Sequence, residues 1–449
     1  LHKEYRRQRQ MCIRDRWYTV SKKLKESFMK KTAIFEDVVS IMTHDSSTIR
    51  DQKGCDPDRF REKITDDMTD DAFLYQVKTY LASFGVIGHV SFGKKKAPNK
   101  GFLLRSTEDG LYVEVTNEDT GLQVGDQILG LDGSDLKQVA SLHKDYFISK
   151  TPERNYREWA DFVSQSTKVT LLREGVEKTI EVIPSREPIQ DHIFWKQLDE
   201  ETVYLRLDNF MEEQAISHLY QECLPLLRET KYLVIDVRKN SGGTDSLYFP
   251  LLHLALSEGQ GYDAIEWQDE GMEILYTNRN ADIRLKDFED LLQQEYLSQE
   301  TKQLIQEMKE ELLKNRGKGY LTYGEDDSEF FPDIKGKAYP ESIVLLSDVY
   351  CGSSGDNFVR MMKNFQKVTV LGRPTLGILD YSNCCEVDYG EYQFFFPTSR
   401  SLAIDHGKSM TDKGVQPDIL VPWSPRHLEN DVDLSLIHIS EPTRQAEIS

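Results

Sequence analysis

Apolar side chains recur at spacings of three and four residues between about 17 and 97, which is the period of helices with one buried face. They form two groups. The first comprises Leu24, Phe28, Ile34, Phe35, Val38, Val39 and Met42, and the second comprises Phe73, Tyr75, Val77, Tyr80, Leu81 and Phe84. A polar, turn-rich stretch from His44 to Arg59 separates the groups. The pattern predicts a helical N-terminal part.

The period changes between about 99 and 185, where short β-like runs alternate with turns. The runs are 101–104, 111–115 and 169–172. Glu174-Gly175 then joins the last run to 178–183, which is typical of a hairpin. These residues predict a small β-rich domain.

From about 187 onward, apolar strands alternate with helical patterns. The run at 232–237 is followed by a glycine-containing loop and a helix from about 245 to 257. The same layout returns at 343–346, and 368–372 predicts another strand. This alternation predicts an α/β core with at least partly parallel strands. The charged helical pattern at 285–316 fits a lid or a solvated helix face.

The acidic composition narrows the classes of partner. The 449 residues include 56 Lys and Arg against 76 Asp and Glu, a formal net charge of −20, so the chain repels phosphate backbones and nucleic acid is not an expected partner. Six cysteines without a CxxC pair, and the lack of an HExxH line, predict neither a disulfide scaffold nor a zinc site, and no cofactor is expected. No apolar run is long enough to predict a membrane span.

Both ends of the chain differ from the rest. Residues 1–16 and 434–449 resemble translated sequencing-adapter read-through, so we expect a non-native leader and tail and exclude them from fold reasoning. No export signal is visible in this sequence. A cytoplasmic location is therefore expected, and the cell envelope stays open if a signal has been lost from the N-terminus.

The segment 350–357 carries the strongest chemical signal. It reads Tyr-Cys-Gly-Ser-Ser-Gly-Asp-Asn and lies between the predicted strand at 343–346 and a helix that begins near Phe358. A serine at such a turn can project its hydroxyl into a cleft, and N–H groups at the helix start can stabilise an oxyanion. Because Ser, Gly and Asp are also ordinary turn and cap residues, this segment alone favours a structural turn.

Several features in chain order change that balance. They are a histidine after a glycine in 84–90, a glycine–aspartate line at 121–133, Asp-x-Arg-x-Asn-x-Gly-Gly at 236–243, Gly-Ser-Ser-Gly-Asp at 352–356, and Gly-Val-Gln-Pro-Asp-Ile at 414–419. Their order resembles the C-terminal processing peptidase and tricorn-core family of serine peptidases over about residues 34–422. The line at 121–133 resembles a PDZ domain.

The resemblance implies a domain organisation. The α/β catalytic core, with ClpP/crotonase-like strand–helix units, is expected at 187–433 with a helical insertion at about 280–318. A helical N-terminal domain at 17–98 would carry His89. A PDZ-like domain at 99–186 would bind an extended peptide as an added strand, and a β module used only for packing is the alternative.

The resemblance also implies the nucleophile and the oxyanion donors. By position, Ser353 is the expected nucleophile. Gly242 or Gly243 would give one oxyanion N–H from its loop, and Ser354 would give the other from its backbone. Glycines permit the close backbone approach that such a site needs.

The expected base is His89, which matches the histidine of the tricorn-like branch. An imidazole can accept the serine proton near neutral pH. Ile378 stands where the processing-peptidase branch has its lysine, so a Ser–Lys dyad is not expected.

The orienting acid stays open between Asp356 and Asp412. The tricorn-like branch has a serine before its histidine and a glutamate shortly before the 414–419 line, whereas this chain has Gly88 and Thr411 there. Each candidate acid has a plainer alternative, a helix N-terminal acid for Asp356 and a turn residue for Asp412. Ser382 is a candidate for an auxiliary hydrogen bond.

The expected function is therefore that of a serine-type peptidase that acts on peptides or proteins through an acyl-enzyme, without a metal. The departures from the family pattern keep an alternative open, a catalytically impaired, peptide-binding homologue. A hydrolase of another acyl substrate on the same core is a third reading. The oligomeric state is not predicted.

Overall fold

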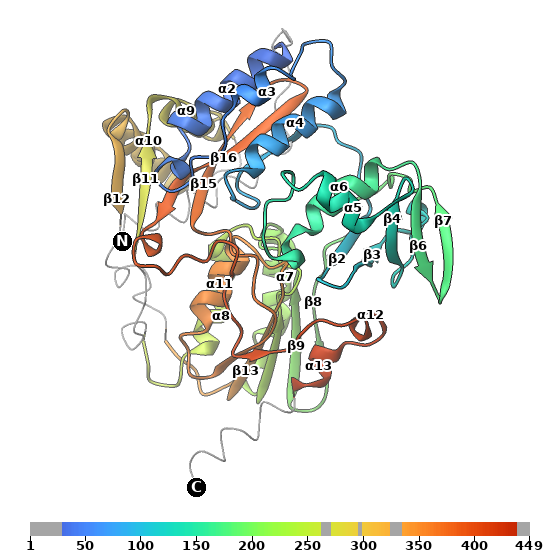
Figure 1. Ribbon diagram of the computed structural model, residues 1–449. Coiled ribbons are helices and arrows are strands. Elements are labelled where there is room, and N and C mark those ends of the chain that lie inside the picture. Colours follow the sequence, from blue (N-terminus) through green and yellow to red (C-terminus); the bar gives the residue numbers. More distant parts are fainter. Residues whose placement is uncertain (1–28, 262–270, 295–298, 324–334, 438–449) are drawn as a thin grey trace. The chain divides into compact units, whose positions relative to one another are not determined.

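The computed structural model describes residues 29–261, 271–294, 299–323 and 335–437 (Figure 1). The chain divides into two compact units, and each is described by itself. Unit 1 takes in 1–97, 267–332 and 378–411, and unit 2 takes in 98–266, 333–377 and 412–449. The expected leader at 1–16 and the apolar positions Leu24 and Phe28 lie outside the described residues.

Unit 1 is built on a five-stranded antiparallel sheet in the order β1-β16-β11-β12, with β15 paired to β16. Its strands are β1 (Ser91–Lys94), β11 (Met272–Tyr276), β12 (Gly319–Tyr323), β15 (Tyr381–Asp388) and β16 (Tyr392–Ser401). Its helices are α2 (Lys31–His44), α3 (Asp58–Arg61), α4 (Asp70–Ala82), α9 (Asn278–Leu292) and α10 (Gln299–Asn315), with 3₁₀ turns η2 (Ser47–Arg50) and η8 (Leu402–Ile404).

The apolar faces of α2 and α4 form the core of unit 1 together with the sheet. Phe35 and Tyr80 meet edge to face with ring centroids 5.3 Å apart, and they share one buried cluster with Phe394 and Phe396 of β16. Thr69 caps α4, since its side chain accepts a hydrogen bond from the first turn. The predicted helices are thus confirmed within 31–44 and 70–82.

The prediction of helix is wrong for 91–94, which form strand β1. Phe92 points into the core and its ring stacks on Tyr392 of β16 at 5.5 Å. In this short segment the alternation of Phe92 with polar neighbours has the period of a strand, and pairing with β16 satisfies its backbone.

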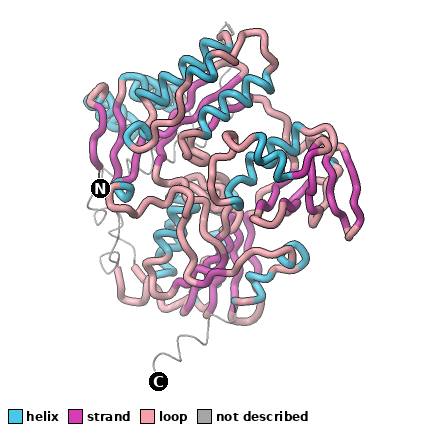
Figure 2. Tube along the Cα trace, viewed as in Figure 1, coloured by secondary structure: helices cyan, strands magenta, loops and turns pink. Residues whose placement is uncertain are grey.

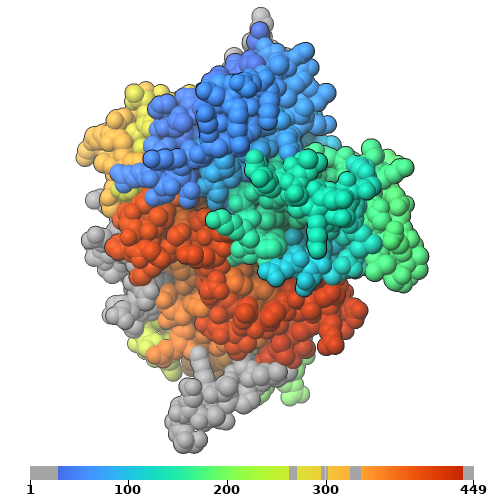
Figure 3. All heavy atoms as spheres, in the orientation of Figure 1, coloured from blue at the N-terminus to red at the C-terminus, as the bar shows by residue number. Residues whose placement is uncertain are grey.

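The β module, residues 99–186 of unit 2, forms an antiparallel sheet in the order β2-β3-β4-β6-β7 (teal to green in Figures 1 and 3). Its elements are β2 (Phe102–Ser106), β3 (Leu111–Thr116), η3 (Glu118–Thr120), β4 (Gln127–Leu131), β5 (Ser134–Asp135), α5 (Leu136–Leu142), η4 (Pro152–Asn155), α6 (Tyr156–Gln165), β6 (Val169–Arg173) and β7 (Val176–Ile180). The predicted hairpin is confirmed. Glu174 and Gly175 both have positive φ, 51° and 77°, as a two-residue hairpin loop of this type requires.

The rest of unit 2 is a six-stranded sheet in the order β17-β14-β13-β10-β9-β8 (Figure 2). All neighbours are parallel except β8, which pairs antiparallel with β9. The strands are β8 (Ile193–Gln197), β9 (Thr202–Leu207), β10 (Tyr232–Asp236), β13 (Ser342–Ser347), β14 (Val368–Gly372) and β17 (Ile419–Leu420). The helices are α7 (Glu213–Cys223), α8 (Phe249–Ala255), α11 (Ser354–Met362), α12 (Arg426–Glu429) and α13 (Val432–Ser435), with 3₁₀ turns η5 (Leu226–Arg228) and η6 (Asp245–Leu247).

The apolar runs at 232–237 and 343–346 become the central strands β10 and β13, which confirms the mixed α/β prediction. Strands buried on both faces need such continuous runs of Val, Ile and Leu. The compact units, however, cut across the expected core at 187–433, because 267–332 and 378–411 belong to unit 1. The cause is strand pairing: β11 and β15 both add to β16 rather than to the parallel sheet.

The first residues of the expected non-native tail lie within the described chain. Residues 434–436 pack against a cluster that includes Tyr204 and Val234, and Ile437 is buried in it. Residues 438–449 lie outside the described part.

A buried carboxylate joins the β module to the parallel sheet within unit 2. Asp348 follows β13 directly and is bound by both terminal nitrogens of Arg105 from β2, at 2.9 and 2.6 Å. Arg373, which follows β14, donates to the same carboxylate at 2.7 Å and also binds Asp433. Burial alone would raise the pKa of Asp348, but the two guanidinium groups outweigh it and hold that pKa well below its usual range.

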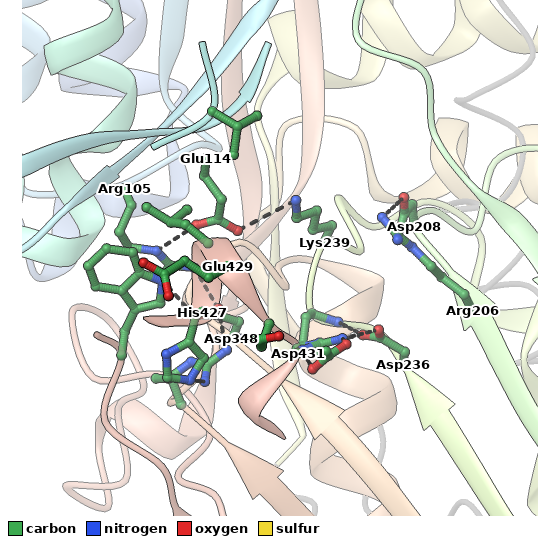
Figure 4. A pocket seen from close by; sticks show the side chains of 16 residues that line it. Arg105, Glu114, Arg206, Asp208, Asp236, Lys239, Asp348, His427, Glu429 and Asp431 are labelled. Atoms are coloured by element: carbon green, nitrogen blue, oxygen red, sulfur yellow. Dashed lines mark hydrogen bonds and ion pairs between the residues drawn. The ribbon is translucent and has the colours of Figure 1, made fainter. Parts of the chain in front are cut away.

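The neighbouring charges line a cavity of about 300 Å³ (Figure 4). Arg105 and Glu114 reach into it from the β module. The other labelled side chains lie at or just after the ends of strands of the parallel sheet, or belong to the C-terminal segment. The lining charges neutralise one another: Arg206 binds Asp208, Arg238 binds Asp236, and Lys239 lies 3.5 Å from Glu114.

Removing Asp348 should destabilise the chain strongly. The substitution Asp348→Ala leaves Arg105 and Arg373 with buried, partly uncompensated charge, so we expect a loss of about 3–5 kcal/mol in the free energy of unfolding near pH 7, measured by urea denaturation. Because the native pKa of Asp348 is lowered, its contribution is present above the unfolded pKa of about 3.9, and the difference should shrink as the pH falls below that value.

Glu201→Ala is the matched control, because the exposed Glu201 meets Lys231 through one 3.3 Å contact at the start of the same sheet. Its urea midpoint should stay close to that of the parent. Equal effects of the two substitutions would show that the buried carboxylate has no special role.

Candidate active site

The turn between β13 and α11 holds Ser353 in a conformation that non-glycine residues rarely adopt. Its φ is 57° and its ψ is −121°. Such backbone strain costs about 1–3 kcal/mol and persists only where the surroundings fix it. A strained serine at a strand-to-helix turn is also the geometry of known serine nucleophiles.

Asp356 fixes this turn. It lies fully buried in the first turn of α11, where a negative charge also complements the helix dipole. One carboxylate oxygen accepts from the Ser353 N–H and the other from the Gly377 N–H, each at 2.9 Å. Asp356 is therefore a positioning residue for the serine turn. Whether it also orients a histidine stays a prediction.

The glycine loop after β10 packs directly against the serine. A Cβ on Gly242 would lie 2.7 Å from Ser353 Cβ, and Gly242 has a φ of 98°, so only glycine fits there. Asn240 holds the loop in place: its side chain accepts from Gly242 N–H at 2.9 Å and donates to Leu207 O at 2.8 Å, and its carbonyl accepts from Gly352 N–H at 2.9 Å.

Two backbone donors remain available beside the serine. Gly243 and Ser354 have N–H groups for which the described residues offer no hydrogen-bond acceptor. Ser354 is the first residue of α11 and so has no intrahelical partner. The N–H of Gly242, by contrast, is used by Asn240. Of the two predicted glycines, Gly243 is therefore the one whose N–H is available as a donor.

His89 lies in unit 1 with 7% of its surface exposed, and its ring is oriented by a main-chain carbonyl. The distance from its Nδ1 to Tyr381 O is 2.5 Å. A carbonyl can only accept a hydrogen bond, so Nδ1 carries the proton and Nε2 is the basic nitrogen. This is the tautomer that a general base requires.

The remaining candidates have other partners. The Asp412 carboxylate accepts from Ser149 Oγ and from Lys150 N–H within unit 2, and its role as the orienting acid stays a prediction. The Ser382 hydroxyl lies 2.8 Å from that of Ser399, across the β15–β16 pair of unit 1. The structure therefore gathers Ser353, Ser354, Asp356 and the glycine loop in unit 2, whereas His89 and Ser382 belong to unit 1.

Several residues that support the site were not predicted. Arg154 of the β module is buried and donates to Leu376 O at 3.1 Å and to Thr375 O at 2.8 Å, next to the Gly377 N–H that binds Asp356. Asn240 lies inside a predicted motif, so its spacing could have marked it. Arg154 and the Tyr381 carbonyl have no sequence signal.

The described residues contain no group of three or more His, Cys, Asp or Glu side chains placed to hold a metal ion. No described helix is long and apolar enough to cross a membrane.

Comparisons with known proteins show which family and which folds this chain resembles. Residues 201–421 match the model of peptidase family S41. A crystal structure of a CPAF mutant is similar with a TM-score of 0.57 at 12% identity, over 91% of this chain and 98% of that chain. The structure of mature CPAF complexed with lactacystin has a TM-score of 0.55 at 13% identity, over 92% and 97% of the two chains. Identities this low show a shared fold alone.

The parallel sheet, the strained serine turn and the family match together define the class of the protein, a serine-type peptidase. More particularly, residues 201–421 are similar to peptidase family S41, in line with the resemblance of the sequence motifs to the C-terminal processing and tricorn-like peptidases.

The role of Asp356 can be tested with an isosteric change. Asp356→Asn replaces one acceptor oxygen by an amide that faces a backbone N–H, so the Ser353 turn should relax. We expect the rate of Ser353 labelling by a peptidyl phosphonate to fall by about 10²-fold, together with a loss of about 1–3 kcal/mol in the free energy of unfolding.

The control is Asp135→Asn, which makes the same change at the N-terminus of α5, where Asn caps as well as Asp. It should label at the parent rate. Parent-like labelling and stability of Asp356→Asn would refute a positioning role.

Proposed function

We propose that the chain hydrolyses peptide bonds through an acyl-enzyme, with Ser353 as the nucleophile and His89 as the general base. The single observation that carries the proposal is the strained Ser353 turn, flanked by the N–H groups of Gly243 and Ser354. The resemblance of the sequence motifs supplies the pairing with His89.

The chemical steps follow the general scheme of serine peptidases. Ser353 Oγ attacks the substrate carbonyl carbon while His89 Nε2 takes the hydroxyl proton. The two N–H groups bind the oxyanion of the tetrahedral intermediate. Collapse of the intermediate breaks the C–N bond, and His89 returns the proton to the leaving amine. A water molecule, deprotonated by His89, then attacks the acyl-enzyme and releases the acid and Ser353.

The proposed catalytic set orients the histidine through a main-chain carbonyl. The Tyr381 carbonyl would orient His89 in place of Asp356 and Asp412, whose oxygens have other donors. A carbonyl dipole stabilises an imidazolium less than a full negative charge does.

We also propose domain roles that follow the expected boundaries. The β module at 99–186 would be a PDZ-like domain that binds peptide or protein substrates, and its sheet has two edge strands, β2 and β7, to which an extended peptide could add. The helical residues at 17–98 would supply His89, and 187–433 would supply the nucleophile and the oxyanion donors on ClpP/crotonase-like strand–helix units.

The proposal predicts covalent labelling that depends on both residues. A peptidyl phosphonate should label the parent, Ser353→Ala should abolish labelling, and His89→Ala should slow it by about 10²–10⁴-fold, because the serine then lacks its base. Intact-protein mass spectrometry measures the extent and the rate.

Matched controls separate these effects from loss of folding. Ser185→Ala removes another buried serine, in the β module, and His44→Ala removes an exposed histidine of α2, so both should label at the parent rate. A folded parent that never labels would favour the impaired, peptide-binding homologue. Labelling that His89→Ala leaves intact would make Ser353 the nucleophile and reject His89 as its base.

A further inference from the structure

A buried carboxyl group lies next to the oxyanion donors and has no role in the scheme above. Asp245 follows the glycine loop by two residues, opens η6, and is 2% exposed. Its Oδ2 accepts from the Asn357 side-chain amide at 3.0 Å. Its Oδ1 is buried and has no hydrogen-bond partner within the described chain.

The groups around Asp245 all belong to unit 2. Ser354, Asn357 and Arg360 face it from α11, and Tyr248 faces it from the start of α8. The Asn357 amide also donates to the Tyr248 hydroxyl oxygen at 3.0 Å, and Arg360 donates to the Asn357 side-chain Oδ1 at 2.9 Å. Arg360 is the one cation in this set.

The Ser354 hydroxyl has two acceptors nearby, Gly243 O and the Asp245 carboxyl group. In the structure it donates to Gly243 O. This bond joins the two chain segments whose N–H groups are the oxyanion donors. The side chain of Ser354 is also close enough to Asp245 to influence its pKa. Since a hydroxyl has one proton, it cannot donate to Gly243 O and to an Asp245 carboxylate together.

Burial disfavours a charge on Asp245. Desolvation raises the pKa of this carboxyl to about 6, and the polar side chains of Ser354, Asn357 and Tyr248 and the charge of Arg360 offset only part of the rise. The buried Oδ1 without a partner agrees with this direction, because an ionised oxygen in that position would lack both water and a donor.

We propose that Asp245 is a positioning residue that works as a neutral carboxylic acid and thereby keeps the Ser354 hydroxyl on the Gly243 carbonyl. This inference rests on the proposed function, since it concerns the geometry of the oxyanion donors. In the neutral form, the Ser354–Gly243 bond holds the two donors at a fixed separation. In the ionised form, the carboxylate draws the hydroxyl away and adds a negative charge beside the site where the oxyanion forms.

The consequence is a loss of activity as Asp245 ionises. The pseudo-first-order rate of Ser353 labelling by a peptidyl phosphonate, measured from pH 5 to pH 9, tests it for the parent and for Asp245→Asn. Asparagine keeps the shape and stays neutral. We expect the ratio of the Asp245→Asn rate to the parent rate to rise with pH, by about tenfold across a midpoint near pH 6. The deprotonation of His89 affects both proteins and cancels in the ratio.

Ser354→Ala shows whether the effect passes through the Ser354 hydroxyl. It removes the hydroxyl and keeps the backbone N–H. In that background, Asp245→Asn should change the pH dependence much less than in the parent. The proposal would be overturned if the ratio of the Asp245→Asn rate to the parent rate stayed constant or fell with pH. It would also be overturned if Asp245→Asn changed the pH dependence as much in the Ser354→Ala background as in the parent.

A stability measurement separates this inference from the proposed function. A raised native pKa means that the folded chain binds a proton that the unfolded chain has lost, so stability falls as the pH rises between about 4 and 6. Asp245→Asn should remove that fall. The difference in thermal midpoint between the variant and the parent should therefore be larger at pH 8 than at pH 5, whether or not any protein labels. No labelling of the parent with this shift present would reject the proposed function alone, and absence of the shift would reject the ionisation of Asp245.

Discussion

The buried carboxylate of Asp348 is the constraint on which the active-site side of unit 2 depends. A carboxylate this deep in the protein is stable only if cations replace its lost water. Arg105 comes from the β module and Arg373 from the end of β14, so one charge ties together segments that are far apart in sequence. Separation of the β module from the sheet would take away both Arg105 contacts to this carboxylate and leave it with Arg373 alone. The serine turn begins at this carboxylate, so it starts from a fixed point.

The same turn is fixed a second time at its other end. Asp356 binds the backbone of Ser353 and of Gly377, and Arg154 of the β module holds the carbonyls just before Gly377. A strained φ at Ser353 is sustained because these contacts over-determine the turn. The β module therefore contributes to the geometry of the nucleophile through side chains that contact no substrate in the proposed mechanism. Its role as a structural support and its proposed role in peptide binding are compatible.

The sequence predicted individual helices and strands better than it predicted which strands pair in one sheet. Continuous apolar runs at 232–237 and 343–346 specify central strands, and the glycine-flanked serine specifies a strand-to-helix turn. The pairing of β1 with β16 could not be predicted, because it depends on contacts across about three hundred residues of chain. Which of Gly242 and Gly243 offers an oxyanion N–H depends on which N–H the Asn240 side chain binds, and the amino-acid sequence does not show that contact. Asp412 was a candidate because of its position, yet its oxygens bind the 149–150 segment.

The carbonyl that orients His89 has an evolutionary consequence. An orienting carboxylate can be lost by a single base change in its codon, whereas every amino acid at position 381 supplies the same main-chain oxygen. The side chain of Tyr381 donates to Asp51 and takes no part in orienting the imidazole. The tautomer of the histidine is therefore insulated from mutation at its partner, and only a shift in the path of β15 can change it. Lineages with such a site can vary the surrounding acids while the imidazole keeps its proton on the same nitrogen.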